Sequence, residues 1–160
     1  MRRARSLALL FVASCAARAT PAAPPAPATG YDAALAQRLG GDEFGMKAYV
    51  VAFLKAGPNR DQSPEEAKAL MAGHLANIER MANEGSLVLA GPFLDDGAYA
   101  GIYVFAVKTI EEAAALTATD PAIQAGRLEM ELHPWYGSAA LGELTPLHRR
   151  IQRTSITAAQ

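Results

Sequence analysis

Residues 63–81 read SPEEAKALMAGHLANIERM and form the most strongly patterned segment of the sequence. Its apolar side chains recur every three to four positions, which is the period of an amphipathic helix. Ser63 can cap the first turn, Pro64 suits the first helical position, and Glu66 completes a capping box. The pattern predicts a long helix that starts at Pro64 and ends near Gly85, with one face buried against a sheet.

His74 lies inside the apolar stripe of this helix, one turn from Leu70 and one turn from Ile78. Histidine is the side chain that titrates near neutral pH, and here it is aimed at the predicted sheet rather than at water. Helical position alone leaves two interpretations open. His74 is either a core residue satisfied by a backbone carbonyl, or a functional group that pairs with another side chain or a ligand.

Four short runs rich in β-branched and aromatic residues predict strands at 47–55, 87–90, 101–107 and 128–135. A second capping box at 109–112 opens a shorter helix, and Asp120-Pro121 breaks it. The order is strand, helix, strand, strand, helix, strand. This is the ferredoxin-like βαββαβ plan of the α+β class, in which both helices pack on one face of the sheet.

The first and third predicted strands are apolar on both faces. In the ferredoxin-like plan the helices leave the second face of the sheet bare. A bare apolar face is usually buried against another copy of the same chain. The sequence therefore predicts a homodimer in which two sheets face each other.

Candidate binding residues outside the long helix are His133, Trp135, Asp95 and Asp96. His133 shares one side of the fourth predicted strand with Glu129 and Glu131. That side is either the solvated face of an edge strand or the polar lining of a cavity between subunits. Trp135 either packs at the strand end or stacks on a ring ligand. Asp95 and Asp96 belong to a turn that is either solvated or at the mouth of a cleft.

The first residues resemble an export signal. Three arginines stand among the first five residues, an apolar run follows at 7–13, and Ala-Arg-Ala at 17–19 suits a signal peptidase. This pattern predicts a signal peptide at 1–19. The protein is then exported, in a bacterium to the periplasm.

A lipoprotein signal at 1–14 is the alternative. Val-Ala-Ser-Cys at 12–15 resembles a bacterial lipobox, and Cys15 lies where such a signal is cut and acylated. The mature protein would then be anchored to the membrane through Cys15. Because Cys15 is the only cysteine, the domain itself has none for a disulfide or for thiol catalysis.

The remaining 140 or so residues suffice for about one domain with tails. Residues 20–45 are predicted to form an Ala/Pro-rich tether with a short helix at 31–39, 46–141 the domain, and 142–160 a polar C-terminal tail. The net charge is −1 and no basic patch stands out, so nucleic acid is not an expected partner. No stretch is predicted to span a bilayer, so membrane contact is expected only through a lipid anchor.

With this pattern in place, residues 46–141 resemble the YCII-related family. The motifs that carry the resemblance are His-Leu-Ala-Asn-Ile at 74–78, Glu-Gly-Ser-Leu-Val-Leu-Ala-Gly-Pro at 84–92, Thr-Asp-Pro at 119–121 with Ala-Gly at 125–126, and His-Pro-Trp at 133–135. The family is similar to the dimeric α/β-barrel group of ferredoxin-like proteins. The resemblance implies a polar site in a cleft formed by His74 and Asp120, and lyase or dehydrohalogenase chemistry on small ring compounds.

A histidine beside a carboxylate is a recurring acid–base unit, because the carboxylate fixes one ring proton and frees the other nitrogen to exchange one. His74 and Asp120 are predicted to lie within hydrogen-bond reach and to line a pocket for a small organic molecule. The expected class is a lyase or an isomerase; the alternative is a non-catalytic small-molecule-binding or interaction module. Asp120 also has a structural interpretation, since aspartate before proline commonly forms a turn. No spacing matches a metal-ligand pattern, so neither a metal nor a cofactor is predicted.

Overall fold

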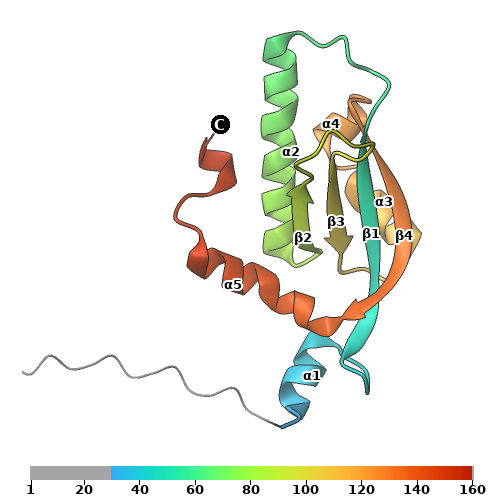
Figure 1. The fold of residues 1–160 in the computed structure, drawn as a ribbon, viewed down its shortest axis with the longest axis vertical. Helices are drawn as coiled ribbons and strands as arrows, with labels where there is room; N and C mark the ends of the chain where they lie inside the picture. The colour runs from blue at the N-terminus through green and yellow to red at the C-terminus, as the bar shows by residue number, and fades with distance from the viewer. Residues whose placement is uncertain (1–29, 160) are drawn as a thin grey trace, which may run out of the picture. The chain divides into compact units, whose positions relative to one another are not determined.

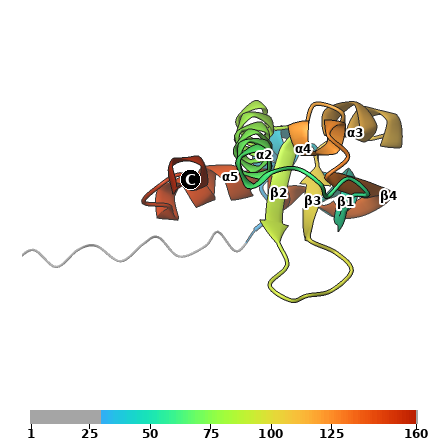
Figure 2. The same ribbon diagram turned by 90° about the horizontal axis from the view of Figure 1, so that it is seen from above.

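The computed structural model describes residues 30–159, and its core is a four-stranded antiparallel sheet in the order β2-β3-β1-β4 (Figure 1). The strands are β1 (Met46–Ala56), β2 (Leu87–Pro92), β3 (Gly101–Phe105) and β4 (Leu128–Ser138). The helices α2 (Pro64–Glu84), α3 (Ile110–Thr117) and α4 (Pro121–Gln124) cover one face of the sheet (Figure 2). The predicted ferredoxin-like α+β fold is confirmed.

Both predicted capping boxes are present. The Ser63 hydroxyl accepts from the Glu66 N–H, and the Glu66 carboxylate accepts from the Ser63 N–H at 2.8 Å. Thr109 and Glu112 repeat the arrangement at α3. These local bonds fix where both helices begin, and so which residues of each face the sheet.

The helix-covered face of the sheet holds the larger hydrophobic core. Its buried members are Val50, Ala52, Leu54, Met81, Leu87, Tyr103, Phe105 and Ala113. In the ladders Ala52 lies opposite Tyr103 on one side and opposite Leu132 on the other. Tyr103 is therefore at the centre of the sheet, under the helices.

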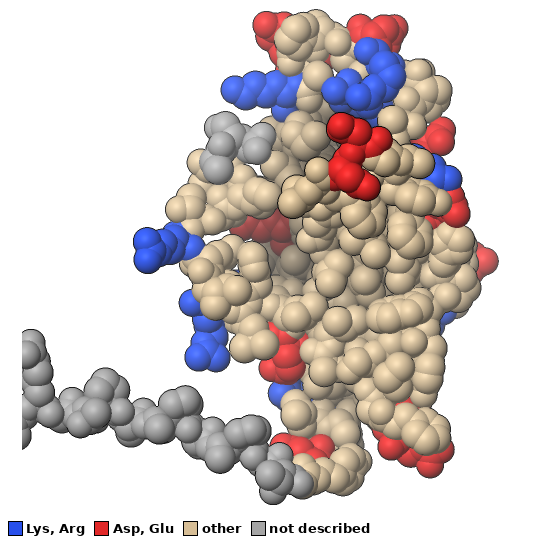
Figure 3. Space-filling view, viewed as in Figure 1, with Lys and Arg blue, Asp and Glu red and all other residues tan. Residues whose placement is uncertain are grey.

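The second face of the sheet carries its own apolar cluster. Tyr49, Val51, Val88 and Val104 are buried in it, and Phe53 and Ile102 pack on it while partly exposed. Figure 3 shows this face as a broad surface with few charged groups over the strands. The predicted two-sided apolar character of β1 and β3 is thus confirmed.

The segment 142–160, predicted from its composition to be a polar tail, is folded over most of its length. It forms the end of a 3-10 turn (Ala139–Glu143), then α5 (Leu144–Ile151) and a second 3-10 turn (Ile156–Ala159). Leu141 packs on the apolar cluster of the second face, and the Thr157 hydroxyl donates to Glu79 of α2 at 2.7 Å. Such short helices depend on tertiary contacts, which composition does not reveal.

The predicted signal peptide at 1–19, the lipobox with Cys15 and the tether up to residue 29 lie outside the described residues. The predicted short helix after the tether is α1 (Ala33–Leu39). Among residues 30–159, no helix has the length and apolar character needed to cross a membrane.

Candidate active site

A close contact between α2 and α4 brings His74 and Asp120 together. A Cβ at Gly73 would lie 3.0 Å from the Pro121 side chain, closer than ordinary van der Waals contact. Glycine at position 73 therefore allows α2 to approach the start of α4. His74, the next residue of α2, is thereby placed against Asp120, the residue that precedes α4.

His74 and Asp120 form a short buried hydrogen bond. The distance from Nδ1 of His74 to Oδ2 of Asp120 is 2.6 Å, and the two residues are 6% and 0% exposed. The second carboxylate oxygen of Asp120 accepts the N–H of Ala122 at 2.9 Å and caps α4. The predicted contact is confirmed, and the two interpretations of Asp120, as partner of His74 and as turn residue, both hold.

Tyr103 completes a chain of three side chains. Its hydroxyl lies 3.2 Å from Nε2 of His74, its ring is stacked on the imidazole, and it is 2% exposed. A carboxylate can only accept, so Nδ1 of His74 carries a proton, and in the neutral imidazole Nε2 then accepts from the Tyr103 hydroxyl. Sequence reasoning missed Tyr103. The available signal was a tyrosine at a helix-facing position of a strand, whose buried hydroxyl needs a partner.

The charge states of Asp120 and Tyr103 are set by burial and by these hydrogen bonds. Burial alone would raise the pKa of the Asp120 carboxyl, but the hydrogen bond with His74, the positive charge of that imidazole in its protonated form, and the backbone N–H groups of Ala122 and Ile123 lower it overall. Burial raises the pKa of the Tyr103 hydroxyl strongly, and the negative charge of Asp120 raises it further. The site thus pairs an ionised carboxylate with a neutral phenol on opposite sides of one imidazole.

A second polar cluster lies one turn further along α2. Oδ1 of Asn77 accepts from Arg80 at 2.8 Å and from the Thr119 hydroxyl at 3.1 Å. Nδ2 of Asn77 is buried and has no acceptor among the described residues. This cluster ties the residue before Asp120 to α2, and sequence reasoning missed it because the partners are about 40 positions apart.

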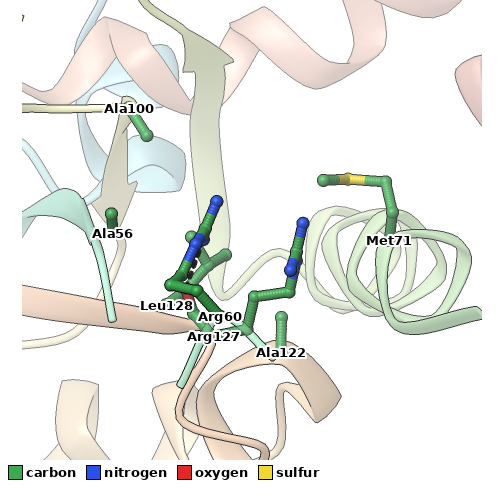
Figure 4. Close-up of a pocket in the computed structure, with 7 residues that line it drawn as sticks. All are labelled: Ala56, Arg60, Met71, Ala100, Ala122, Arg127 and Leu128. Atoms are coloured by element: carbon green, nitrogen blue, oxygen red, sulfur yellow. Dashed lines mark hydrogen bonds between the residues drawn. The ribbon is translucent and has the colours of Figure 1, made fainter. Parts of the chain in front are cut away.

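The predicted pocket lies beside the pair, not around it. A cavity of about 220 Å³ opens next to the site (Figure 4). Its lining consists of two arginines, Arg60 and Arg127, and five apolar residues, Ala56, Met71, Ala100, Ala122 and Leu128. Met71 is one turn before His74, and Ala122 is the residue bonded to Asp120. The expectation that His74 and Asp120 themselves line the pocket is wrong for this cavity, because Tyr103 covers Nε2 of His74.

The other candidate residues are not brought to His74. His133 lies on the second face of the sheet, where its Nε2 contacts Glu131 at 2.9 Å and its ring packs against Phe53. Trp135, 42% exposed, packs on Tyr49 with ring centroids 5.8 Å apart. Asp95 and Asp96 are exposed in the β2–β3 loop, where Asp95 lines a separate cavity of about 190 Å³. His133 and Trp135 thus lie on the same side of β4, facing away from the helices, which is the side on which the sequence placed His133.

The fold and the buried pair define a ferredoxin-like α+β protein with a histidine–carboxylate site. Residues 48–136 match the YCII-related domain, and the chain belongs to the YCII-related family.

The known proteins that this chain resembles include the following two. The uncharacterised protein YjpA of Bacillus subtilis (strain 168) is 35% identical over 65 residues, which cover 41% of this chain and 74% of YjpA. The solved structure of 5-chloro-2-hydroxyhydroquinone dehydrochlorinase (TftG) from Burkholderia phenoliruptrix AC1100, in complex with 2,5-dihydroxybenzoquinone, is 18% identical with a TM-score of 0.41. That match covers 56% of this chain and 93% of the other. A likeness of this degree assigns neither that enzyme's reaction nor its ligand to this chain.

The first prediction concerns the Asp120 carboxylate. Its pKa in the folded protein is below the ordinary value of 3.8, so the ionised form stabilises the fold at neutral pH and the effect is lost below pH 3.8. Asn at position 120 can still cap Ala122 but carries no charge. Asp120→Asn is expected to lower the free energy of unfolding by about 1–3 kcal/mol at neutral pH, with a smaller deficit at about pH 3.

Urea unfolding at both pH values measures this difference. The exposed Asp61 supplies the matched control, because Asp61→Asn should change the free energy of unfolding by less than about 0.5 kcal/mol. An Asp120→Asn variant as stable as the wild type at both pH values would contradict the role given to the carboxylate.

Proposed function

We propose that this YCII-related protein is an acid–base enzyme acting on a small organic molecule, with lyase or isomerase chemistry. The observation that carries the proposal is the buried chain Asp120–His74–Tyr103 beside a cavity of about 220 Å³. Elimination and isomerisation need a group that removes a proton and a group that returns one. The three hydrogen-bonded side chains include both kinds of group in fixed orientation.

Each residue of the chain has its own role. Asp120 holds Nδ1 of His74 in the protonated tautomer, so Nε2 is the nitrogen that removes a proton. Tyr103 keeps its proton, because the pKa of its hydroxyl is raised, and it acts as the donor. The Tyr103 contact, at 3.2 Å, is longer than the 2.6 Å contact to Asp120 and is the weaker of the two. Nε2 becomes available to the substrate when the Tyr103 side chain moves away from it.

One observation favours the second candidate, a non-catalytic binding module. Both ring nitrogens of His74 have partners, and the residue is 6% exposed. In that case Asp120, His74 and Tyr103 are polar core residues whose hydrogen bonds are satisfied within the protein, and only the cavity binds ligands. The two candidates differ in what removal of His74 does to turnover.

The second prediction separates them. Compounds that raise the melting temperature of the wild type in a small-molecule screen identify ligands, and ¹H NMR then follows their conversion. His74→Ala and Tyr103→Phe are each expected to slow conversion by about 10²-fold or more, because each removes one proton-transfer group.

Ile78→Ala is the matched control on the same helix. Ile78 packs against the core, so its truncation should cost about 2–5 kcal/mol of stability while turnover by the folded fraction is retained. Wild-type turnover by His74→Ala would overturn the catalytic proposal and leave the binding module in its place.

A homodimer through the second face of the sheet is part of the proposal. Phe53 and Ile102 pack on this face and are partly exposed, next to the buried Val51. At its rim Lys55 forms an ion pair with Glu131, and Glu131 also contacts Nε2 of His133 at 2.9 Å. An apolar centre with a polar rim is the usual composition of a subunit interface.

The third prediction tests this assembly. Phe53→Glu places a charge in the apolar centre, and the variant is expected to sediment as a monomer at micromolar concentration where the wild type sediments as a dimer. Lys68→Glu, an exposed change on α2, should leave the dimer intact. Circular dichroism confirms that each variant is folded. A wild-type protein that sediments as a monomer would refute the interface.

The proposal also places the protein outside the bacterial cytoplasm, on the basis of the sequence at 1–19. The fourth prediction is that mass spectrometry of protein from its native host finds an N-terminus at residue 20, after cleavage of the signal peptide. Cleavage before an acylated Cys15 is the lipoprotein outcome. Recovery of a chain that starts at Met1 or Arg2 would contradict export.

A further inference from the structure

The cavity beside His74 carries an unbalanced positive charge. Arg60 and Arg127 both line it, and the remaining lining residues are apolar. Among the described residues, neither guanidinium forms an ion pair with a carboxylate, although Arg38, Lys55 and Arg80 do. We infer that the cavity binds a small organic carboxylate, with its charged group between the two arginines and its apolar body against Met71 and Leu128. This inference names the substrate class of the proposed acid–base site and rests on that function.

The two arginines are held close together by backbone contacts. Nη1 of Arg60 donates to the Arg127 carbonyl oxygen at 3.1 Å, and the same oxygen accepts the N–H of Gly57 at 2.8 Å. A Cβ at Gly57 would lie 2.2 Å from the Gly126 carbonyl oxygen, so only glycine permits this approach. The loop before α2 is thus fixed onto the start of β4, and each arginine has a defined position before any ligand arrives.

Most of the hydrogen-bond donors of the two arginines are not used within the protein. Nη1 of Arg127 donates to Gln62 at 2.8 Å, and Nη1 of Arg60 makes the backbone contact described above. A guanidinium has five N–H donors in a planar fork that matches a carboxylate. Two like charges at one cavity repel each other, and an anion between them removes that repulsion. Figure 4 shows both side chains extending from the same side of the cavity.

The apolar part of the cavity leads toward the acid–base chain. Met71 is one turn before His74, and the backbone of Ala122 is bonded to Asp120. A ligand anchored at the arginines therefore extends along the two elements that carry the pair. Apolar walls favour an organic body over a bare inorganic anion, because burial of that body against them is favourable.

Isothermal titration of the purified protein with benzoate, benzamide and inorganic phosphate tests the inference. Benzoate is expected to bind, and Arg60→Gln and Arg127→Gln are each expected to weaken it about tenfold or more, because each removes a charge-assisted hydrogen bond. Benzamide, which has the same shape without the charge, should bind at least about tenfold more weakly than benzoate. Arg150→Gln, an exposed change on α5, is the control and should bind benzoate like the wild type.

Three results would overturn the inference: no benzoate binding up to about 10 mM, which is weaker than any useful affinity; equal binding of benzoate and benzamide; or phosphate binding as tight as benzoate binding. His74→Ala is measured in the same series and should keep its benzoate affinity. The arginine variants are judged by their benzoate affinity, and the acid–base role of His74 is judged by turnover. Failure of the carboxylate site can therefore be distinguished from failure of the acid–base function.

Discussion

The hydrogen bond between His74 and Asp120 depends on the approach of α2 to α4, and much of the domain is arranged around that approach. Gly73 removes the side chain that would keep the helices apart. Asn77 and Thr119 add a second tie one turn away. The α3–α4 connection is therefore held to α2 at two neighbouring points, and the imidazole is left between this connection and the sheet. A substitution at Gly73 or at Asn77 would therefore shift Asp120. Because His74 bonds both Asp120 and Tyr103, the position of Asp120 relative to Tyr103 would change too.

Asp120 illustrates how one residue serves the fold and the site together. One of its oxygens caps α4 and the other orients His74. The cap fixes the carboxylate in place, so the imidazole meets a partner that is already positioned. Preorganisation of this kind is what an acid–base pair needs, since a freely rotating carboxylate would lose entropy each time it engaged. The turn that ends α3 is thus part of the proposed catalytic geometry.

The fold was predictable from the sequence because its signals are local. The capping boxes at Ser63 and Thr109 and the four apolar strands are read from neighbouring residues, and they suffice for the ferredoxin-like plan. The His74–Asp120 contact followed from the helical stripe together with the family resemblance. Tyr103 was missed although its strand position offered a signal, whereas the partners of Asn77 and the arginine-lined cavity could not be predicted, since each depends on how distant segments approach. The helix α5 was missed for the same reason. His133 lies on the second face of the sheet, the side predicted from the alternation of the fourth strand, and its proposed role in binding stays a prediction.

Burial of three polar side chains in one core is not explained by stability alone. Replacement of a buried charged pair by well-packed apolar residues is often neutral or stabilising, because the desolvation cost offsets most of the attraction. In a domain of this size, many combinations of apolar side chains could fill the space under α2. The chain Asp120–His74–Tyr103 therefore has to be accounted for by something other than folding energy, and sites that depart from the rules of an apolar core are commonly functional. Under the proposed function, the adjacent cavity is the place for the substrate, which the buried pair itself does not offer. Its two arginines form no ion pair with a carboxylate among the described residues, and in the proposed site they would hold the charged group of the ligand.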